Sequence, residues 1–312
     1  MRFPPVIYSL FLGIAITAHA APLDRQAVPA DAKWVVHIDL DAARAAQVAQ
    51  KVYDDWLSHG IAHESLRDIR QTLGMDLLED VRGITFYATR FEPYGGVVLI
   101  RAKVNRPRLM ELLEANSTHA VHRRGSRELH TWVQEVESLK STLAGCFYGP
   151  NLVVISRRLE EVEAALAVLD AKAPSLAGSG SGLDRSAAQG TVFQGGVIDL
   201  SELADEELPF VSPIIRNADA IAVDIGEDDG RVFLRLRIGT PSAAVAGRVR
   251  DVIVGFRGMT GLERHGDQGT LDALDALDIA AEGATVNVDW RMPGPKVMRL
   301  IEQEWVKQRQ EE

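Results

Sequence analysis

Five arginines gather in one short stretch of an otherwise acidic chain, and they are the side chains best placed for chemistry. They are Arg106, Arg108, Arg123, Arg124 and Arg127. The first two stand where we expect a helix to start, and a helix N-terminus adds N–H donors and partial positive charge. The other three surround an expected hairpin turn. These arginines are therefore the candidates for binding an anionic group or partner, and charge reversal at Arg123, Arg124 and Arg127 would then weaken that binding without unfolding the protein.

The interpretation that we favour for these arginines is that they lie on a solvated surface and pair with nearby carboxylates. Glu111, Glu114 and Glu128 are close enough in the sequence to provide such partners. Exposed ion pairs of this kind are common and contribute little to stability.

Histidines are the next candidates, because imidazole is the commonest metal ligand and general base near neutral pH. His59 and His63 have the spacing that places two ligands on one helical face. Gly60 interrupts that helix, however, and no Glu stands between the histidines as it does in a His-Glu-x-x-His metal site. We expect solvated polar positions there.

A second histidine group surrounds the arginine-rich hairpin. It consists of His119, His122 and His130. If the turn is centred on Ser126, His122 and His130 face each other across the two strands and could form a two-ligand site. No third ligand is in register with them, so we expect an ordinary surface hairpin.

Other motifs predict structure rather than chemistry. The segment Glu227-Asp228-Asp229-Gly230 suits a hairpin turn and lacks the spacing of an EF-hand loop. The residues 178–182 alternate Gly and Ser but lack the flanking strand and helix of a nucleophile elbow. Cys146 begins an apolar stretch and is expected to be a buried thiol. We predict no catalytic, cofactor-binding or metal-binding residue and favour a protein that is not an enzyme, although the question stays open.

The elements expected around these residues follow a similar order in two halves of the chain. The first half is expected to contain strands or hairpins over residues 34–40, 83–89, 96–103, 120–133 and 145–156, and helices over residues 42–57, before Gly74, after Asn105 and over residues 159–171. The second half is expected to contain strands over residues 197–200, 220–226, 231–239 and 285–290, and helices from Thr240 and over residues 293–310. The alternation and helical spacing of apolar residues carry these assignments.

Two of the expected helices have apolar faces that should pack on a sheet. The helix after Asn105 presents three leucines, Leu109, Leu112 and Leu113. The helix from Thr240 presents Val245, Val249, Val252 and Phe256 on one side. Asp39 and Asp199 stand at matching strand ends, where an aspartate caps the helix that follows.

This order predicts an α+β fold of two tandem units, each similar to a split βαβ arrangement, with antiparallel sheets covered on one face by helices. The alternative is one continuous sheet that spans both halves, with the Gly/Ser-rich stretch as a surface loop. The expected divisions are a signal peptide at residues 1–20, a first α+β unit at 28–173, a flexible Gly/Ser-rich linker at 174–190 and a second α+β unit at 191–312.

The opening of the first unit resembles that of uncharacterised exported bacterial proteins with duplicated α+β halves. The resemblance lies in Val28-Pro29-Ala30-Asp31-Ala32, in the strand Val35-Val36-His37-Ile38-Asp39 that follows, and in the repeated order of elements. It implies the same fold, and it carries no site residue because none is established for that group.

The N-terminus predicts export. A basic start at Arg2 precedes an apolar run of residues 6–17, and Ala18-His19-Ala20 gives a small-x-small cleavage pattern before Ala21. The run is too short to span a bilayer, so we expect no stable membrane span after cleavage. The single cysteine permits no intramolecular disulfide. We expect a periplasmic or secreted protein.

The net charge of the chain restricts the classes of partner that we expect. Without residues 1–20 the chain keeps 33 Lys and Arg against 44 Asp and Glu, so its formal charge is −11. An acidic protein disfavours nucleic acid as a generic partner. We predict a non-catalytic binding or interaction module for an envelope protein or a small ligand, with a homo-oligomer as a further expectation. The alternative is an exported hydrolase or metal-dependent enzyme whose site assembles only in three dimensions.

Overall fold

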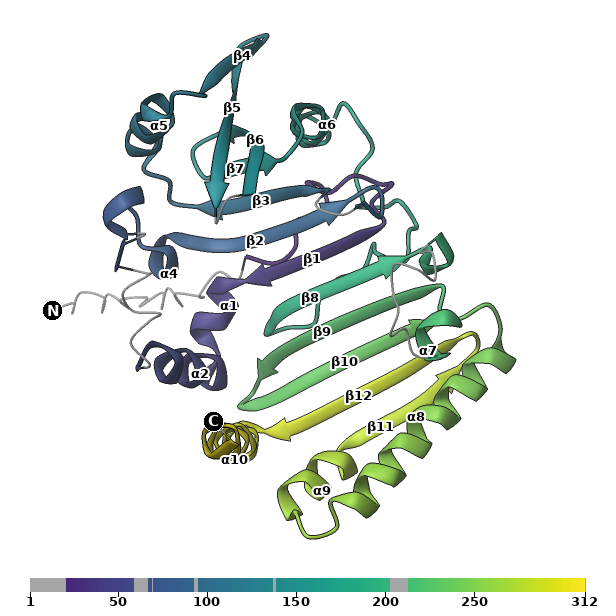
Figure 1. Cartoon of the computed structure of the whole chain (residues 1–312). Coiled ribbons are helices and arrows are strands. Elements are labelled where there is room, and N and C mark those ends of the chain that lie inside the picture. The colour runs from purple at the N-terminus through teal and green to yellow at the C-terminus, as the bar shows by residue number, and fades with distance from the viewer. Residues whose placement is uncertain are drawn as a thin grey trace, which may run out of the picture.

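The computed structural model describes residues 21–58, 67–68, 70–92, 95–136, 139–202 and 213–311. Its strands form one antiparallel 12-stranded sheet in the order β11-β12-β10-β9-β8-β1-β2-β3-β7-β6-β5-β4 (Figure 1). The two halves of the chain meet at β1 (Trp34–Asp39) and β8 (Thr191–Ile198), where Trp34 lies opposite Val197. The α+β class is confirmed. The sequence left open whether the two halves have separate sheets or share one continuous sheet, and the described strands form one continuous sheet.

The other elements of the first half are antiparallel strands with helices between them. The strands are β2 (Val81–Ala88), β3 (Val97–Ala102), β4 (Ala120–Arg124), β5 (Arg127–Val136), β6 (Leu139–Tyr148) and β7 (Leu152–Ser156). The helices are α1 (Leu40–Ala45), α2 (Gln47–Ser58), α4 (Leu77–Asp80), α5 (Arg106–Ala115) and α6 (Leu159–Leu169).

The second half follows a shorter version of this order. Its strands are β9 (Ala220–Asp228), β10 (Arg231–Gly239), β11 (Leu277–Glu282) and β12 (Thr285–Pro293). Its helices are η1 (Leu200–Glu202), α7 (Pro213–Arg216), α8 (Ala243–Glu263), α9 (Gln268–Asp275) and α10 (Gly294–Glu311). Outward from the shared centre, the pairing order β8-β9-β10-β12-β11 matches β1-β2-β3-β7-β6.

Several local signals act as the sequence predicts. The Asp39 side chain accepts from the Ala42 N–H at 2.8 Å and starts α1. The Asn105 side chain accepts from the Arg108 N–H at 3.3 Å and starts α5. Gly74 ends its helical turn with a φ of +65°, which glycine adopts without strain.

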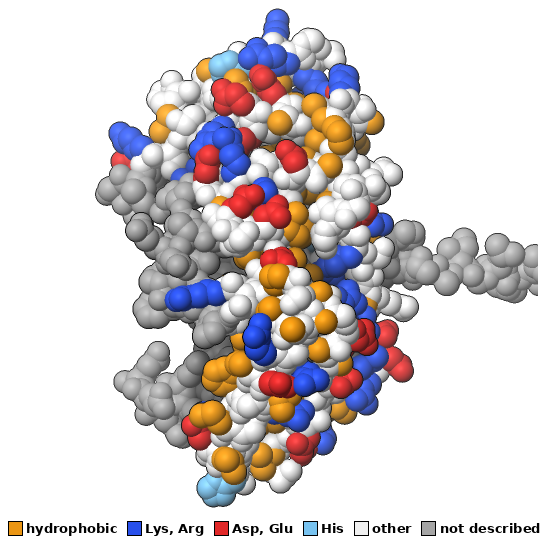
Figure 2. All heavy atoms as spheres, turned by 90° about the vertical axis from the view of Figure 1, so that its right-hand side faces the viewer, with side chains coloured by type: hydrophobic (Ala, Val, Ile, Leu, Met, Phe, Trp, Pro, Cys, Tyr) orange, Lys and Arg blue, Asp and Glu red, His pale blue; other side chains and the backbone are white. Residues whose placement is uncertain are grey.

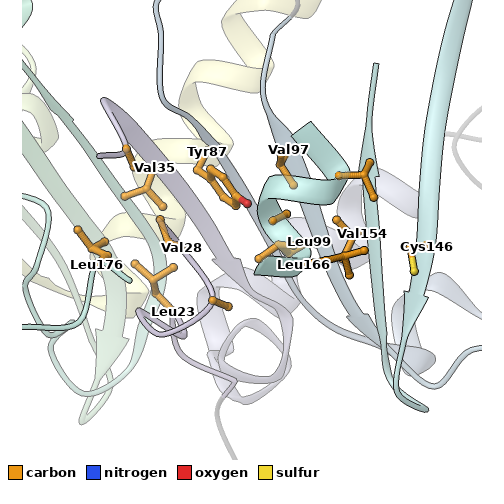
Figure 3. Close-up of a cluster of buried hydrophobic side chains, with 14 of the residues drawn as sticks. Leu23, Val28, Val35, Tyr87, Val97, Leu99, Cys146, Val154, Leu166 and Leu176 are labelled. Atoms are coloured by element: carbon orange, nitrogen blue, oxygen red, sulfur yellow. The ribbon is translucent and has the colours of Figure 1, made fainter. Parts of the chain in front are cut away.

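The main core lies on one face of the sheet in the first half. Alternate residues of neighbouring strands, such as Val35, Tyr87 and Leu99, point to this face. They pack under Leu166 of α6 and beside the N-terminal segment, which includes Val28 (Figure 3). In the second half the opposite face is covered instead, by α8.

The residues 174–190 are packed against this core. Leu176 is 0% exposed and Leu183 is 2% exposed, and the Leu176 N–H donates to the Val28 carbonyl at 2.7 Å. Arg185 also forms a buried ion pair with Asp224 of β9. The prediction of a flexible linker is therefore wrong on this point, because two leucines anchor a Gly/Ser-rich segment whose composition alone suggests mobility.

Helix α8 packs with a different phase from the one predicted. Its buried side follows Ala246 and Val249, continues with the partly buried Ile253, and reaches Arg257, which donates to the Leu277 carbonyl of β11 at 3.1 Å. This series keeps the 3.6-residue period of a helix.

The predicted apolar face of α8 diverges from that buried side after Val249. Val252 is 41% exposed and Phe256 is 58% exposed. Together with Met259 and Leu262 they form an exposed apolar stripe on α8, from the middle of the helix to its C-terminal end. Figure 2 shows hydrophobic side chains spread among charged ones over the half of the molecule where α8 lies.

Among the described residues, no helix combines the length and the apolar character needed to cross a membrane.

Candidate functional site

Two of the five candidate arginines are tied to α6. Arg124 pairs with Glu163 at 2.6 Å. Arg127 donates to both carboxylate oxygens of Asp170, at 2.6 Å each. Both arginines point to the sheet face that α6 covers, so their charge is neutralised within the fold.

Two more arginines have carboxylate partners on the surface. Arg108 pairs with Glu111 one helical turn away at 3.0 Å. Arg123 pairs with Glu128 across the hairpin at 3.3 Å. The five arginines thus do not converge on one surface. Four of them pair with carboxylates, as the solvated-surface interpretation expects, and two of those partners, Glu111 and Glu128, are ones that the sequence had suggested.

Arg106 is different. Its guanidinium lies over the ring of Phe147, 5.0 Å from the ring centroid, and it has no carboxylate partner among the residues that the structure describes. Of the predicted anion-binding residues, this one keeps an available positive charge.

The arginine-rich hairpin closes through a two-residue turn, Gly125-Ser126, because Arg124 pairs directly with Arg127. This register places His122 opposite Leu129, and His130 opposite Val121. His122 and His130 therefore point to opposite faces of the sheet, and the two-ligand arrangement considered from the sequence is wrong. A shift of one residue in register is enough to reverse the face of every side chain.

His130 instead meets His119. His119 Nε2 lies 3.0 Å from His130 Nδ1, and the two rings stack with centroids 5.3 Å apart. Within the described part of the chain, no group of three or more histidine, cysteine or acidic side chains could hold a metal ion. His59 and His63 lie outside the described residues.

A cavity of about 420 Å³ lies beneath α5, on the sheet face opposite α6. Its floor comes from strands β3, β7, β6 and β5, and its roof is the apolar side of α5. Residues on the floor include Ile100, Val153, Ile155, Phe147 and Trp132. The roof consists of Leu109, Leu112 and Leu113, the three leucines that the sequence predicted as the packing face of this helix.

The cavity exists because α5 stands off the sheet. None of the ten residues of α5 is fully buried, although its three leucines face the floor. A helix that packed directly on the sheet would bury these side chains as α6 buries Val162 and Leu166. The apolar surface of α5 and of the sheet therefore remains available to a third component.

Polar side chains are scarce around this cavity. Apart from the indole of Trp132, the lining includes only Asn116, His130 and Gln134 as polar residues. The Asn116 amide donates to the Val133 carbonyl at 3.1 Å and is thus already satisfied. His130 is the polar lining residue with an unsatisfied hydrogen-bonding atom among the described residues.

His130 is 2% exposed, and its Nε2 has no hydrogen-bond partner among the described residues. Leaving such a buried group unsatisfied costs about 1–3 kcal/mol. Burial lowers the pKa of His130 below its ordinary value, and the nearby His119 and the positive charge of Arg106 act in the same direction. The ring is therefore neutral at pH 7, and it forms part of the lining of an apolar cavity.

A second cavity, of about 570 Å³, lies on the other sheet face between α6 and the N-terminal segment. Its walls include Ala164, Ala165 and Ala167 of α6. Tyr87 is 3% exposed there, and its hydroxyl has no hydrogen-bond partner among the described residues. Burial raises the pKa of Tyr87 well above its ordinary value, so this hydroxyl stays protonated.

The remaining buried histidine is satisfied. His37 Nδ1 lies 2.9 Å from the Thr85 hydroxyl, and Nε2 donates to the Ala21 carbonyl at 2.8 Å. The space beside this pair measures only about 10 Å³, too little for a substrate. Cys146 is buried, and burial raises the pKa of its thiol, as expected for an unreactive cysteine.

No family model matches the chain, and no curated protein matches it. Among solved structures it is similar to crystal form III of TP0453, with 8% identity, a TM-score of 0.47, and coverage of 92% of this chain and 99% of that one. It is also similar to crystal form I of TP0453, with 10% identity, a TM-score of 0.45, and coverage of 91% and 98%. Similarity at this level supports no statement about function.

Sequence reasoning named His130 as a candidate ligand but missed the cavity to which it belongs. The leucines of α5 were identified, but whether they rest on the sheet or above a space depends on the loops around the helix. The available signal was His130 itself, which lies two residues before Trp132 on the same side of β5. A histidine in line with an inward-facing tryptophan is a buried polar group that needs a partner.

Proposed function

We propose that the protein is a non-catalytic exported binding protein that holds a small apolar molecule between α5 and the sheet. The observation that carries this proposal is the apolar cavity of about 420 Å³ beneath α5, whose lining includes the buried His130 with an Nε2 that is unpartnered among the described residues. Small-molecule sites usually measure about 300–1,000 Å³ and combine apolar walls with a few polar groups that fix orientation. The cavity has this size and this composition.

The surroundings of the buried histidines favour binding over catalysis. The hydrogen-bond partner of His130 is His119, so the pair lacks a hydroxyl or thiol nucleophile. The His37–Thr85 pair has a hydroxyl but no room beside it for a substrate. The alternative function is that of a hydrolase or metal-dependent enzyme. Hydrolytic activity of the purified protein, with or without an added metal ion, would support it.

The proposed location is the periplasm or the extracellular space. The apolar run at residues 6–17 and the cleavage pattern before Ala21 support it. The matching pairing order of the two halves supports an origin by duplication of one α+β unit, as the resemblance to exported proteins implies. In this proposal the first unit carries the ligand site.

The test is binding of Nile red, a neutral apolar dye whose emission rises in apolar surroundings. We expect saturable binding of one dye per mature chain. In Leu112→Lys a charge stands in the roof of the cavity, and we expect the affinity to fall about tenfold or more, since a buried charge without a partner is costly.

The matched control is Leu262→Lys, because Leu262 is 78% exposed on α8. Circular dichroism shows whether each variant is folded. Binding that is equal in wild type and both folded variants would place the dye elsewhere and contradict the proposal. A dye that fails to bind the wild-type protein would contradict it as well.

A further inference from the structure

Helix α8 has an apolar side that faces solvent. The exposed fraction of this side rises from 41% at Val252, through Phe256 and Met259, to 78% at Leu262. The helix lies at the outer end of the sheet, beside the edge strand β11, where another molecule can approach it (Figure 1). A contiguous exposed apolar surface marks a contact with a partner more often than a solvated face does.

A charged residue stands at each end of this stripe. Arg248 lies one helical turn before Val252, and Glu263 lies one turn after Met259, so all four residues share one side of the helix. Both charged residues are exposed, and neither forms an ion pair with another residue that the structure describes. The stripe therefore begins with an available positive charge and ends with an available negative charge.

This order of side chains is complementary to a second copy of itself. When two copies of α8 lie side by side in opposite directions, Arg248 of each copy can lie opposite Glu263 of the other. The same alignment places Val252 opposite Met259, because the two pairs have the same midpoint in the sequence. Charge and apolar contacts are therefore satisfied by one alignment, in which every contact occurs twice about a two-fold axis.

The shared midpoint falls between Gly255 and Phe256. In this alignment the two Phe256 rings meet at the two-fold axis, and the two glycines allow the helices to approach closely. Glycine weakens the interior of a helix. The fold of the single chain does not require it here, since a methyl group added at Gly255 would meet no other part of the described chain within 4 Å.

We propose that the protein forms a homodimer through α8, with the two helices antiparallel and their apolar stripes packed against each other. A parallel pair would place Arg248 opposite its own copy and Glu263 opposite its own copy, and such like-charge contacts oppose association. One helix pair buries less surface than the roughly 1,000 Å² of a stable interface, so we expect a weak dimer with a Kd on the order of 10 µM. In more dilute samples the chain is monomeric and the stripe stays exposed.

The test is sedimentation velocity of the chain without residues 1–20 at concentrations from about 1 to about 200 µM. We expect the dimer fraction to rise over this range. Phe256→Glu should weaken dimerisation about tenfold or more, because it places two carboxylates together at the centre of the contact. Arg250→Glu is the matched control and should dimerise as wild type does, since Arg250 lies on the opposite side of the helix and pairs with Asp251.

Exchanging the two end charges tests the alignment. Arg248→Glu alone and Glu263→Arg alone should each weaken the dimer about tenfold, because each places like charges opposite one another. The double variant Arg248→Glu/Glu263→Arg should restore the wild-type Kd, since opposite charges then meet with their positions exchanged. All the substituted residues of the stripe are exposed, and circular dichroism verifies that each variant is folded.

Three outcomes would overturn the proposal. The first is a wild-type chain that stays monomeric up to about 200 µM. The second is a dimer that Phe256→Glu leaves unchanged, because the contact would then lie on another surface. The third is a folded double variant that dimerises no better than the single charge variants, which would exclude the antiparallel alignment. The cavity beneath α5 belongs to the first half of the chain, so none of these outcomes decides whether Nile red binds there.

Discussion

Arg127 holds both carboxylate oxygens of Asp170 at 2.6 Å and so ties strand β5 to the end of α6. Tyr148 completes the contact: its ring lies 4.9 Å from the Arg127 guanidinium, and its hydroxyl donates to the Leu169 carbonyl at 2.9 Å. An arginine that the sequence offered for ligand binding is thus used to join a strand to the helix that covers it.

The first prediction concerns charge reversal on the hairpin. We expect Arg127→Glu to lower the Tm, because it places two carboxylates together at the β5–α6 junction. Arg123→Glu on the same hairpin should leave the Tm unchanged, since Arg123 is 81% exposed. We therefore expect charge reversal to leave folding intact at Arg123 and to disturb it at Arg127. Thermal unfolding followed by circular dichroism measures both, and equal Tm values for the two variants would refute this assignment.

The same ion pair predicts a response to acid. Arg127, and then Lys172, hold the pKa of Asp170 well below its ordinary value. A lowered folded-state pKa means that the contribution is complete above the unfolded pKa of about 3.9 and is lost as the pH falls through the folded value. We expect Asp170→Asn to be less stable than wild type at pH 6 and to lose less Tm between pH 5 and pH 2. Parallel Tm curves for the two proteins would contradict this.

A second pH effect comes from His37. Burial lowers its pKa, so the folded state resists protonation more than the unfolded state does. Stability is then complete above the unfolded pKa of about 6.5 and falls as the pH drops below it. We expect the Tm of His37→Gln to depend less on pH between 7.5 and 5 than that of wild type. His265→Gln, at an exposed position, serves as the control and should retain the wild-type slope.

The sequence predicts those features of this fold that local chemistry decides. Asp39 and Asn105 cap helices as expected, and the turn at Asp229-Gly230 has positive φ angles of 51° and 67° at its two residues. Such a two-residue hairpin turn favours Asp and Gly for this reason. In each case the signal and the structure that it determines lie within a few residues of one another.

The features that the sequence does not predict depend on one residue of register or on distant packing. The hairpin closes at Gly125-Ser126, and that choice alone separates His122 from His130. The cavity depends on how far α5 stands from strands that are distant in the chain. Arg106 was among the predicted residues, but its partner Phe147 lies 41 positions later and shares no local pattern with it.

The next prediction concerns which side of α8 is buried against the sheet. Val249 is 5% exposed and Phe256 is 58% exposed, although the helical spacing of apolar residues had placed them on one buried face. Val249→Ala should destabilise the protein by about 1–3 kcal/mol, because it removes two buried carbon groups and leaves a space. Phe256→Ala should stay within about 0.5 kcal/mol of wild type. Urea denaturation measures both, and a larger loss for Phe256→Ala would show that the stripe is covered.

Export predicts a defined N-terminus. Ala21 is 9% exposed, and its carbonyl accepts from His37 Nε2 at 2.8 Å. Cleavage after Ala20 leaves this contact in the mature chain. We expect N-terminal sequencing of protein from the envelope fraction to begin at Ala21, and Ala18→Leu to block processing. Protein that retains residues 1–20 in the cytosol would rule out export.

The last prediction concerns the hydroxyl of Tyr87. It is buried without a partner among the described residues, so its removal forfeits no hydrogen bond and spares the cost of burying a polar atom. We expect Tyr87→Phe to be as stable as wild type or more stable. Tyr148→Phe is the matched control, and it should lose about 1 kcal/mol because its hydroxyl donates to the Leu169 carbonyl. A comparable loss in Tyr87→Phe would mean that the hydroxyl is satisfied in solution, and the second cavity would then become a site to test with polar ligands.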